Sequence, residues 1–145
     1  MKVIDKNVCF GLIVATRGFF NPVLAGTARK ELLELLDELS IEYVIGSEDA
    51  TPHGTVENLE HAKIYAKLFR ENAERIDGVL VILPNFGDEL GVVQTLDMAR
   101  LNVPVMVQAC KDELDKVGVF SRRDAFCGKI SVCNNLYQYN IPFTD

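Results

Sequence analysis

The sequence lacks the features that mark membrane, secreted and nucleic-acid-binding proteins. No apolar run reaches the ~18 residues that cross a bilayer, and the start MKVIDKNVCFGLIVAT has no signal-peptide cleavage pattern. No basic run is interleaved with aromatic residues, and the net charge of −6 disfavours contact with nucleic acid or an anionic membrane. We therefore expect a cytoplasmic protein that binds neither nucleic acid nor membrane.

Paired cysteine motifs are missing as well. The sequence contains four cysteines without CxxC spacing, all in apolar or helical stretches: Cys9, Cys110, Cys127 and Cys133. Buried, reduced thiols are typical of such positions in a cytoplasmic protein, so a disulfide framework is disfavoured.

Common nucleotide, metal and triad motifs are also absent. The segment after the first apolar run, ATRGFFNPVLAG, contains neither GxGxxG nor a P-loop, and Thr16 and Arg17 stand where a phosphoacceptor domain needs acidic residues. His53 and His61 are eight residues apart instead of four, and no cysteine or carboxylate completes a metal shell with them. Neither histidine falls at a predicted strand end, so no catalytic triad is assigned. We expect a binding edge with no catalytic set and no metal site in this chain.

What the sequence does contain is a regular alternation of apolar strands and amphipathic helices. We predict strands at 8–16, 41–47, 78–83 and 103–109, and helices at 25–39, 59–76, 88–101 and 122–139. Near-continuous aliphatic strands between helices predict one three-layer, doubly wound, Rossmann-like (flavodoxin-like) α/β domain with a parallel sheet. The closing IPFTD looks like the first residues of a truncated fifth strand, which would leave an exposed sheet edge.

The last predicted helix has an apolar face and a basic start. The residues expected to pack on the sheet are Phe126, Ile130, Cys133 and Tyr137. Ser121 is the expected N-cap. Arg122 and Arg123 would then lie in the first turn, where positive charge is unfavourable for the helix dipole. They indicate either an acidic partner or ligand anion, or a solvated pair.

Ligands of doubly wound sheets bind beyond the carboxyl ends of the strands. Arg17 follows the first strand, and its guanidinium suits a carboxylate, a phosphate or several sugar hydroxyls. The alternative is a surface arginine paired with Glu48 or Asp88. Asp88 itself is expected chiefly as a helix N-cap.

An aromatic residue in the turn LPNFGDELG adds to this predicted edge. Phe86 could stack on the apolar face of a sugar, pack on a neighbouring subunit, or pack in the core beneath its loop. Asn85 precedes it, and Gln108 comes from the fourth strand. The predicted substrate-binding residues are Arg17, Asn85, Phe86 and Gln108, and no catalytic residue is assigned.

Two long segments resemble the amino-terminal domain of L-fucose/L-arabinose isomerase-like proteins. They are DGVLVILPNFGDELGVVQTLDMARLNVPVMVQAC and RRDAFCGKISVCNNLYQYNIPFTD, within a resemblance over roughly residues 8–145. The resemblance implies the first domain of a three-domain enzyme that interconverts aldoses and ketoses through a cis-enediol with a divalent metal, usually Mn²⁺. It places the metal ligands and acid/base carboxylates in later domains, while the first domain reaches across a subunit boundary to the sugar. In this resemblance Arg17 matches a sugar-contacting arginine, and Phe86 with Asn85 matches the aromatic position over the substrate.

The resemblance makes residues 1–145 the amino-terminal domain of a longer, homo-oligomeric protein. We expect a substrate-recognition and assembly domain that is inactive alone, because proton transfer between C1 and C2 needs a metal and a placed base. Two other functions stay open. One is a stand-alone small-molecule (sugar) binding module that uses the same crevice, and the other is a structural oligomerisation domain whose aromatic residues pack on a partner.

Overall fold

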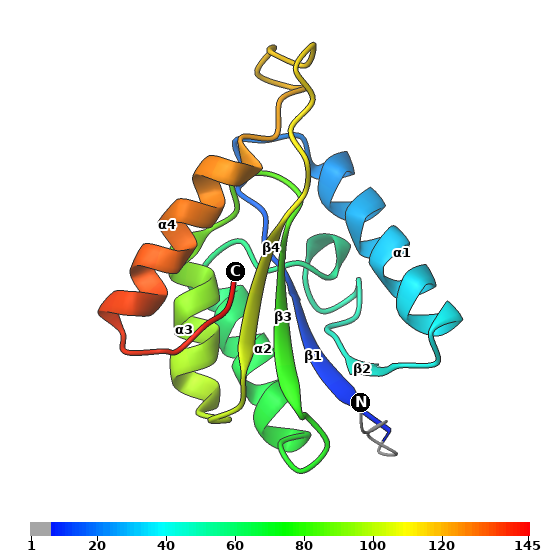
Figure 1. The fold of residues 1–145 in the computed structure, drawn as a ribbon, viewed down its shortest axis with the longest axis vertical. Helices are drawn as coiled ribbons and strands as arrows, with labels where there is room; N and C mark the ends of the chain where they lie inside the picture. Colours follow the sequence, from blue (N-terminus) through cyan, green and yellow to red (C-terminus); the bar gives the residue numbers. More distant parts are fainter. Residues whose placement is uncertain (1–6) are drawn as a thin grey trace, which may run out of the picture.

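The computed structural model describes residues 7–145, which form a four-stranded parallel sheet flanked by helices (Figure 1). The strands are β1 (Cys9–Val14), β2 (Glu42–Val44), β3 (Gly78–Leu83) and β4 (Val105–Ala109). The helices are α1 (Pro22–Glu38), α2 (Leu59–Glu71), α3 (Glu89–Ala99) and α4 (Ala125–Gln138), with a short 3-10 helix η1 (Pro52–Gly54). The strand order β2-β1-β3-β4 confirms the predicted doubly wound α/β fold.

The order of the strands determines which face of the sheet each helix covers. The chain moves from β1 to β2 in one direction and then from β2 through β3 to β4 in the other. Because parallel crossovers are right-handed, α1 lies on one face and α2 and α3 on the opposite face. Helix α4 contacts α3, β4 and β3, and Figure 1 shows α1 across the sheet from α3 and α4.

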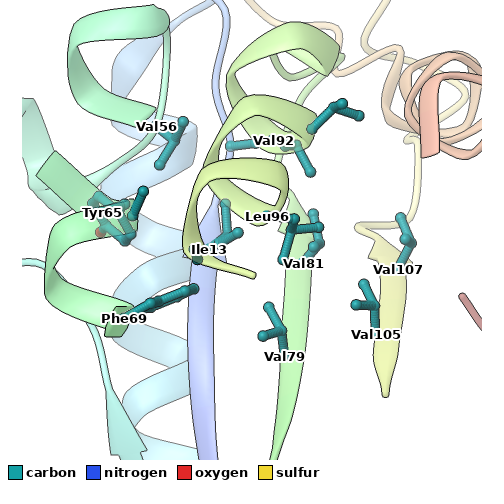
Figure 2. Close-up of a cluster of buried hydrophobic side chains, with 14 of the residues drawn as sticks. Ile13, Val56, Tyr65, Phe69, Val79, Val81, Val92, Leu96, Val105 and Val107 are labelled. Carbon is teal, nitrogen blue, oxygen red and sulfur yellow. The ribbon is translucent and has the colours of Figure 1, made fainter. Parts of the chain in front are cut away.

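The main core lies between the sheet and helices α2, α3 and α4. Val79 and Val81 of β3 point toward Val92 and Leu96 of α3, and these side chains are buried (Figure 2). Aliphatic residues alternate inward along β3 and β4, which removes a large apolar area from water. The other labelled members of this core are Ile13, Val56, Tyr65, Phe69, Val105 and Val107.

The opposite face of the sheet is covered unevenly. Leu12 and Val14 of β1 are fully buried beneath the α1 side. In register with Leu12 lie Leu80 and Met106, of which Leu80 is partly exposed and Met106 exposed. Of the four α-helices in residues 7–145, α1 alone lies on this face, and the β3–β4 half of the face is more accessible to solvent.

The closing residues of the chain pair with β4, as the predicted start of a fifth strand requires. Thr144 forms a parallel bridge with Met106. The Thr144 N–H donates to the Val105 carbonyl at 2.8 Å, and the Val107 N–H donates to the Thr144 carbonyl at 2.9 Å. The chain therefore runs along the outer edge of β4 at this point.

The cysteines are free, as expected, but their burial differs from the prediction. Cys9 is buried, Cys110 and Cys133 are half-buried, and Cys127 is exposed on α4. Among the helices of the described part of the chain, none combines the length and the apolar character that a membrane span needs.

The prediction of which side of α4 faces the sheet is wrong. Phe126, Ile130 and Tyr137 are 64%, 59% and 77% exposed, and Cys133 is only half-buried. The buried residues of α4 are Ala125, Gly128, Val132 and Leu136. The helix is therefore rotated from the predicted orientation, so that its small residues face the sheet and its large ones face solvent.

Candidate functional site

A buried amide joins the carboxyl ends of β1 and β3. The side-chain amide of Asn85 donates to the Thr16 hydroxyl at 2.7 Å, and its oxygen accepts from the backbone N–H groups of Arg17 at 3.3 Å and Gly87 at 3.0 Å. Asn85 is fully buried, and these three bonds satisfy both ends of its amide. The bonds hold the turn after β3 against the turn after β1, which brings Arg17 and Phe86 together.

The Arg17 guanidinium lies over an aromatic ring and beside a carboxylate. Its Cζ atom is 4.7 Å from the centroid of the Phe86 ring, within the range of a cation–π contact. One of its terminal nitrogens forms an ion pair with Glu89 in the first turn of α3. We call Arg17, Phe86 and Glu89 the Arg17 site. Phe86 and Glu89 together fix the direction of a side chain that otherwise has many rotamers.

Further aromatic rings extend the Arg17 site along the turn after β1. Phe20 is buried and stacks on Phe86 with ring centroids 6.4 Å apart and an interplanar angle of 19°. The exposed Phe19 packs edge-on against Phe20 at 5.8 Å. These rings form an apolar border next to the charged pair.

Two glycines allow the turn that carries Phe86 to sit where it does. Gly87 has φ +74°, a left-handed conformation that glycine adopts without steric cost. A Cβ on Gly128 of α4 would lie 2.6 Å from Phe86 Cα and closer still to the Phe86 carbonyl oxygen. Helix α4 therefore touches the backbone of the Phe86 turn directly.

Asp88 caps α3, as predicted, and adds negative charge beside the Arg17 site. Its carboxylate accepts from the backbone N–H of Gly91. Burial is the main cause that raises the pKa of the Asp88 carboxyl, and the negative charge of Glu89 raises it further. The hydrogen bond from Gly91 and the positive charge of Arg17 both lower this pKa. The Glu57 carboxylate lies against Gly18, next to Arg17. Glu89 and Asp88 thus add negative charge near the Arg17 guanidinium, and Glu57 adds a third carboxylate beside the neighbouring residue.

The loop between β4 and α4, residues 110–124, is tied to the turn after β3. We call this loop the arm; it projects beyond the carboxyl end of the sheet in Figure 1. Arg123 donates to the Pro84 carbonyl at 2.9 Å and lies 3.8 Å from the Glu113 carboxylate. Arg122 pairs with Asp124 at 2.9 Å. Since α4 begins at Ala125, both arginines precede the helix, and the prediction that they occupy its first turn is wrong.

The amino terminus of α4 is capped from the arm. The Asp112 carboxylate accepts from the N–H groups of Ala125 at 3.3 Å and Phe126 at 3.2 Å. Asp124 is the N-cap residue but makes no side-chain capping bond. Ser121, the predicted N-cap, instead donates to the Gly118 carbonyl at 3.1 Å. A cap supplied from outside the helix has no local sequence signature.

No group of three or more His, Cys, Asp or Glu side chains in residues 7–145 is arranged to hold a metal ion.

A cavity of about 620 Å³ lies between α1 and the arm. Its lining comes from Thr27, Ala28 and Glu31 of α1, and from 110–115 and Arg123. The Arg17 site does not line this cavity, so the carboxyl edge of the sheet carries two separate features.

The sequence model of the fucose/sulfoquinovose isomerase N-terminal domain family matches residues 11–145. The chain belongs to this family. Searches of curated proteins and of solved structures gave no match. The family assignment confirms the resemblance stated from the sequence, and the match includes both the Arg17 site and the arm.

In this isomerase N-terminal domain, the predicted site residues do not all lie together. Arg17 and Phe86 are in contact, and Asn85 lies beneath them with its amide used in holding the turns. Gln108 is exposed on β4, in register with Ile82, and donates to the Ala109 carbonyl at 3.0 Å. No contact joins Gln108 to the Arg17 site among the described residues.

Sequence reasoning missed two residues, Glu89 of the Arg17 site and Phe20, which borders the site. Glu89 lies in the turn LPNFGDELG, but only Glu48 and Asp88 were predicted as partners for Arg17. Phe20 was not singled out, although an aromatic pair two residues after an arginine at a strand end is a usable signal. In this isomerase N-terminal domain both residues position the groups that could meet a ligand.

Proposed function

We propose that this chain is the sugar-recognition and assembly domain of an aldose–ketose isomerase, and that Arg17 and Phe86 contact the sugar. The observation that carries this proposal is the Arg17 guanidinium over the Phe86 ring at the carboxyl edge of an isomerase N-terminal domain. A guanidinium can donate to several hydroxyl groups, and an aromatic ring offers apolar contact to the C–H groups of a sugar. Asn85 supports both residues from below.

The charge around Arg17 favours a neutral sugar. Glu89 offsets the charge of the guanidinium, Asp88 adds a second carboxylate near it, and the Glu57 carboxylate lies against the neighbouring Gly18. A sulfonate would be repelled by this excess of negative charge, whereas a neutral polyol can use the same groups as hydrogen-bond partners. Of the two sugars in the family description, we expect fucose to bind more tightly than sulfoquinovose.

The proton transfer itself is assigned to other parts of a longer parent protein. Interconversion of an aldose and a ketose requires a base, and a divalent metal can stabilise the charge that develops on the sugar oxygens. The described residues offer no ligand cluster that fits such a metal. Under this proposal Mn²⁺ and the base belong to other domains, and the sugar lies at a boundary between subunits of a cytoplasmic homo-oligomer. Under this proposal Gln108 would contact the sugar only where another domain or subunit brings the sugar close to β4.

The proposal can be tested by nuclear magnetic resonance titration of the 145-residue chain with L-fucose and with sulfoquinovose. We expect fucose to shift the amide signals of Arg17 and of 86–89 at concentrations of about 1–100 mM, the range of weak binding. Arg17→Ala should weaken binding roughly tenfold, the cost of losing a hydrogen bond to a charged group. Arg75→Ala is the control, because this exposed arginine pairs with Glu42 before β3, away from the Arg17 site.

Two results would contradict the proposal. One is the absence of saturable shifts with either sugar, and the other is binding that Arg17→Ala and Arg75→Ala affect equally. Tighter binding of sulfoquinovose than of fucose would leave the recognition role intact but overturn the charge argument.

A further inference from the structure

Helix α4 exposes an apolar stripe along its length. The stripe consists of Phe126, Ile130, Cys133 and Tyr137, which follow one another at steps of four, three and four residues and therefore share one face of the helix. Three of these side chains are largely exposed, while Cys133 is half-buried at the border of the core. We call this set the α4 stripe. Scattered exposed apolar residues are common, but an aligned set over three helical turns marks an interaction surface.

Helix α4 itself carries almost no charge. Lys129 is the one charged residue among the 14 of α4, and its amine lies 3.6 Å from an Asp145 carboxylate oxygen. By comparison, six of the 17 residues of α1 are charged. A helix face that stays in water normally carries charged residues. The lack of charge on α4 is typical of a face that becomes buried in an assembly, since interface centres are depleted in charge.

The stripe is complementary to itself when the helix is reversed. Its steps of four, three and four residues read the same in both directions. In an antiparallel pair of α4 helices, Phe126 of one copy therefore lies level with Tyr137 of the other, and Ile130 lies level with Cys133. Two aromatic pairs flank two small apolar pairs in this arrangement, and aromatic pairs contribute beyond their buried area.

We propose that the α4 stripe packs antiparallel against the α4 stripe of a second copy of this chain, around a two-fold axis near the middle of the helix. A two-fold contact uses the same patch on both copies and so requires a self-complementary patch. The net charge of −6 makes two copies repel one another on average. The single charge of α4, on Lys129, is paired with Asp145, so the helix itself adds no unpaired like charge to such a contact. The proposal does not depend on sugar recognition by the Arg17 site.

The first experiment measures self-association of the 145-residue chain by sedimentation equilibrium. We expect a monomer–dimer equilibrium at protein concentrations up to about 1 mM, which includes weak contacts. Ile130→Glu should raise the dissociation constant at least about tenfold, because it places two buried charges at the centre of the contact. Leu35→Glu is the matched control: Leu35 is 51% exposed on α1, across the sheet from α4. Circular dichroism verifies that each variant keeps its fold.

The second experiment tests the register of the pair by disulfide formation. In a Cys127→Ser background, Ile130→Cys places a new thiol level with Cys133 of the other copy. Mild oxidation should then produce a covalent dimer, and the further change Cys133→Ser should abolish most of it. The same oxidation of the Cys127→Ser parent, which keeps Ile130, should produce little dimer.

Three outcomes would overturn the proposal. The chain could remain monomeric over the whole concentration range. Ile130→Glu and Leu35→Glu could affect association equally, which would place the contact elsewhere. Cross-linking could also proceed as well without Cys133, which would exclude the antiparallel register.

Discussion

At the scale of single residues, Asp88 combines a favourable hydrogen bond with an unfavourable burial. Its carboxylate caps α3 through the Gly91 N–H, yet burial raises its pKa above the ordinary value. A raised pKa in the folded state means that ionisation costs stability. The protonated Asp88 therefore favours the folded state. This favourable contribution is complete below the unfolded pKa of about 3.9 and is lost as the pH rises through the folded pKa.

We therefore predict opposite results for two substitutions of Asp88. Asp88→Asn keeps an oxygen acceptor for the Gly91 N–H but cannot ionise, so at neutral pH it should be at least as stable as the parent. Asp88→Ala removes the cap and should cost about 1 kcal/mol. Urea unfolding at a series of pH values checks both. As the pH falls below the Asp88 pKa, the free energy of unfolding of the parent should rise relative to that of Asp88→Asn. A fall of the parent's free energy of unfolding relative to the variant on acidification would contradict the sign of this pKa shift.

At the scale of elements, the contact between α4 and the Phe86 turn depends on Gly128. A Cβ at this position would overlap the backbone of Phe86, so α4 or the turn must move. We predict that Gly128→Ala lowers the free energy of unfolding by about 1–3 kcal/mol, the cost of overpacking. It should also shift the amide signals of 85–88, because the displaced turn carries Phe86. Thermal unfolding and a two-dimensional amide spectrum provide the two measurements.

Gly26 in the second turn of α1 is the matched control for Gly128. A Cβ there would lie 3.4 Å from His53 Nδ1, an ordinary contact. Gly26→Ala should therefore be neutral or stabilising by up to about 1 kcal/mol, since alanine has the higher helix propensity. Equal destabilisation by the two substitutions would show that close packing of α4 on the turn is not the cause.

The same glycine explains why the elements were easier to predict than their orientation. Strand β3 was predicted at its observed bounds, because a run of aliphatic residues between turns has few alternatives. In α4, both the stripe of Phe126 and Ile130 and the face of Val132 and Leu136 are apolar, and few charges mark a solvent side. The rotation of the helix is set by how closely Gly128 allows it to approach, which is a tertiary property.

In the candidate site, too, the position of residues along the strands was predictable, but the contacts that depend on helix orientation were not. The carboxyl-edge rule brought Arg17 and Phe86 together correctly, because parallel strand ends must meet. The ion partner of Arg17 could not be predicted, since several carboxylates were within reach of the same strand ends and the angle of α3 selects Glu89. Gln108 fell outside the Arg17 site because it alternates with the buried Val107, which places it with Met106 on the exposed side of β4.

At the scale of the whole molecule, the sheet is asymmetric in both its faces and its edges. Among the α-helices of residues 7–145, three lie on one face and α1 lies on the other, where Leu80 and Met106 are partly open to solvent. Within residues 7–145, backbone pairing along the outer edge of β4 is limited to Thr144. An open edge of a parallel sheet offers unpaired N–H and C=O groups to any strand that can align with it.

This asymmetry predicts a step in hydrogen exchange along β4. The Cys110 N–H donates to the Leu83 carbonyl at 2.9 Å, so alternation directs the amides of Val107 and Ala109 toward the outer edge. Within residues 7–145, the Val107 amide is bonded to Thr144 and the Ala109 amide has no acceptor. We predict that Val107 exchanges at least about tenfold more slowly than Ala109 in the monomeric chain.

Removing 143–145 should bring the Val107 rate close to that of Ala109 while leaving the central strand β3 protected. Slow exchange of both amides in a verified monomer would show that the edge is covered along its whole length, and the asymmetry of the sheet would then be smaller than these contacts indicate.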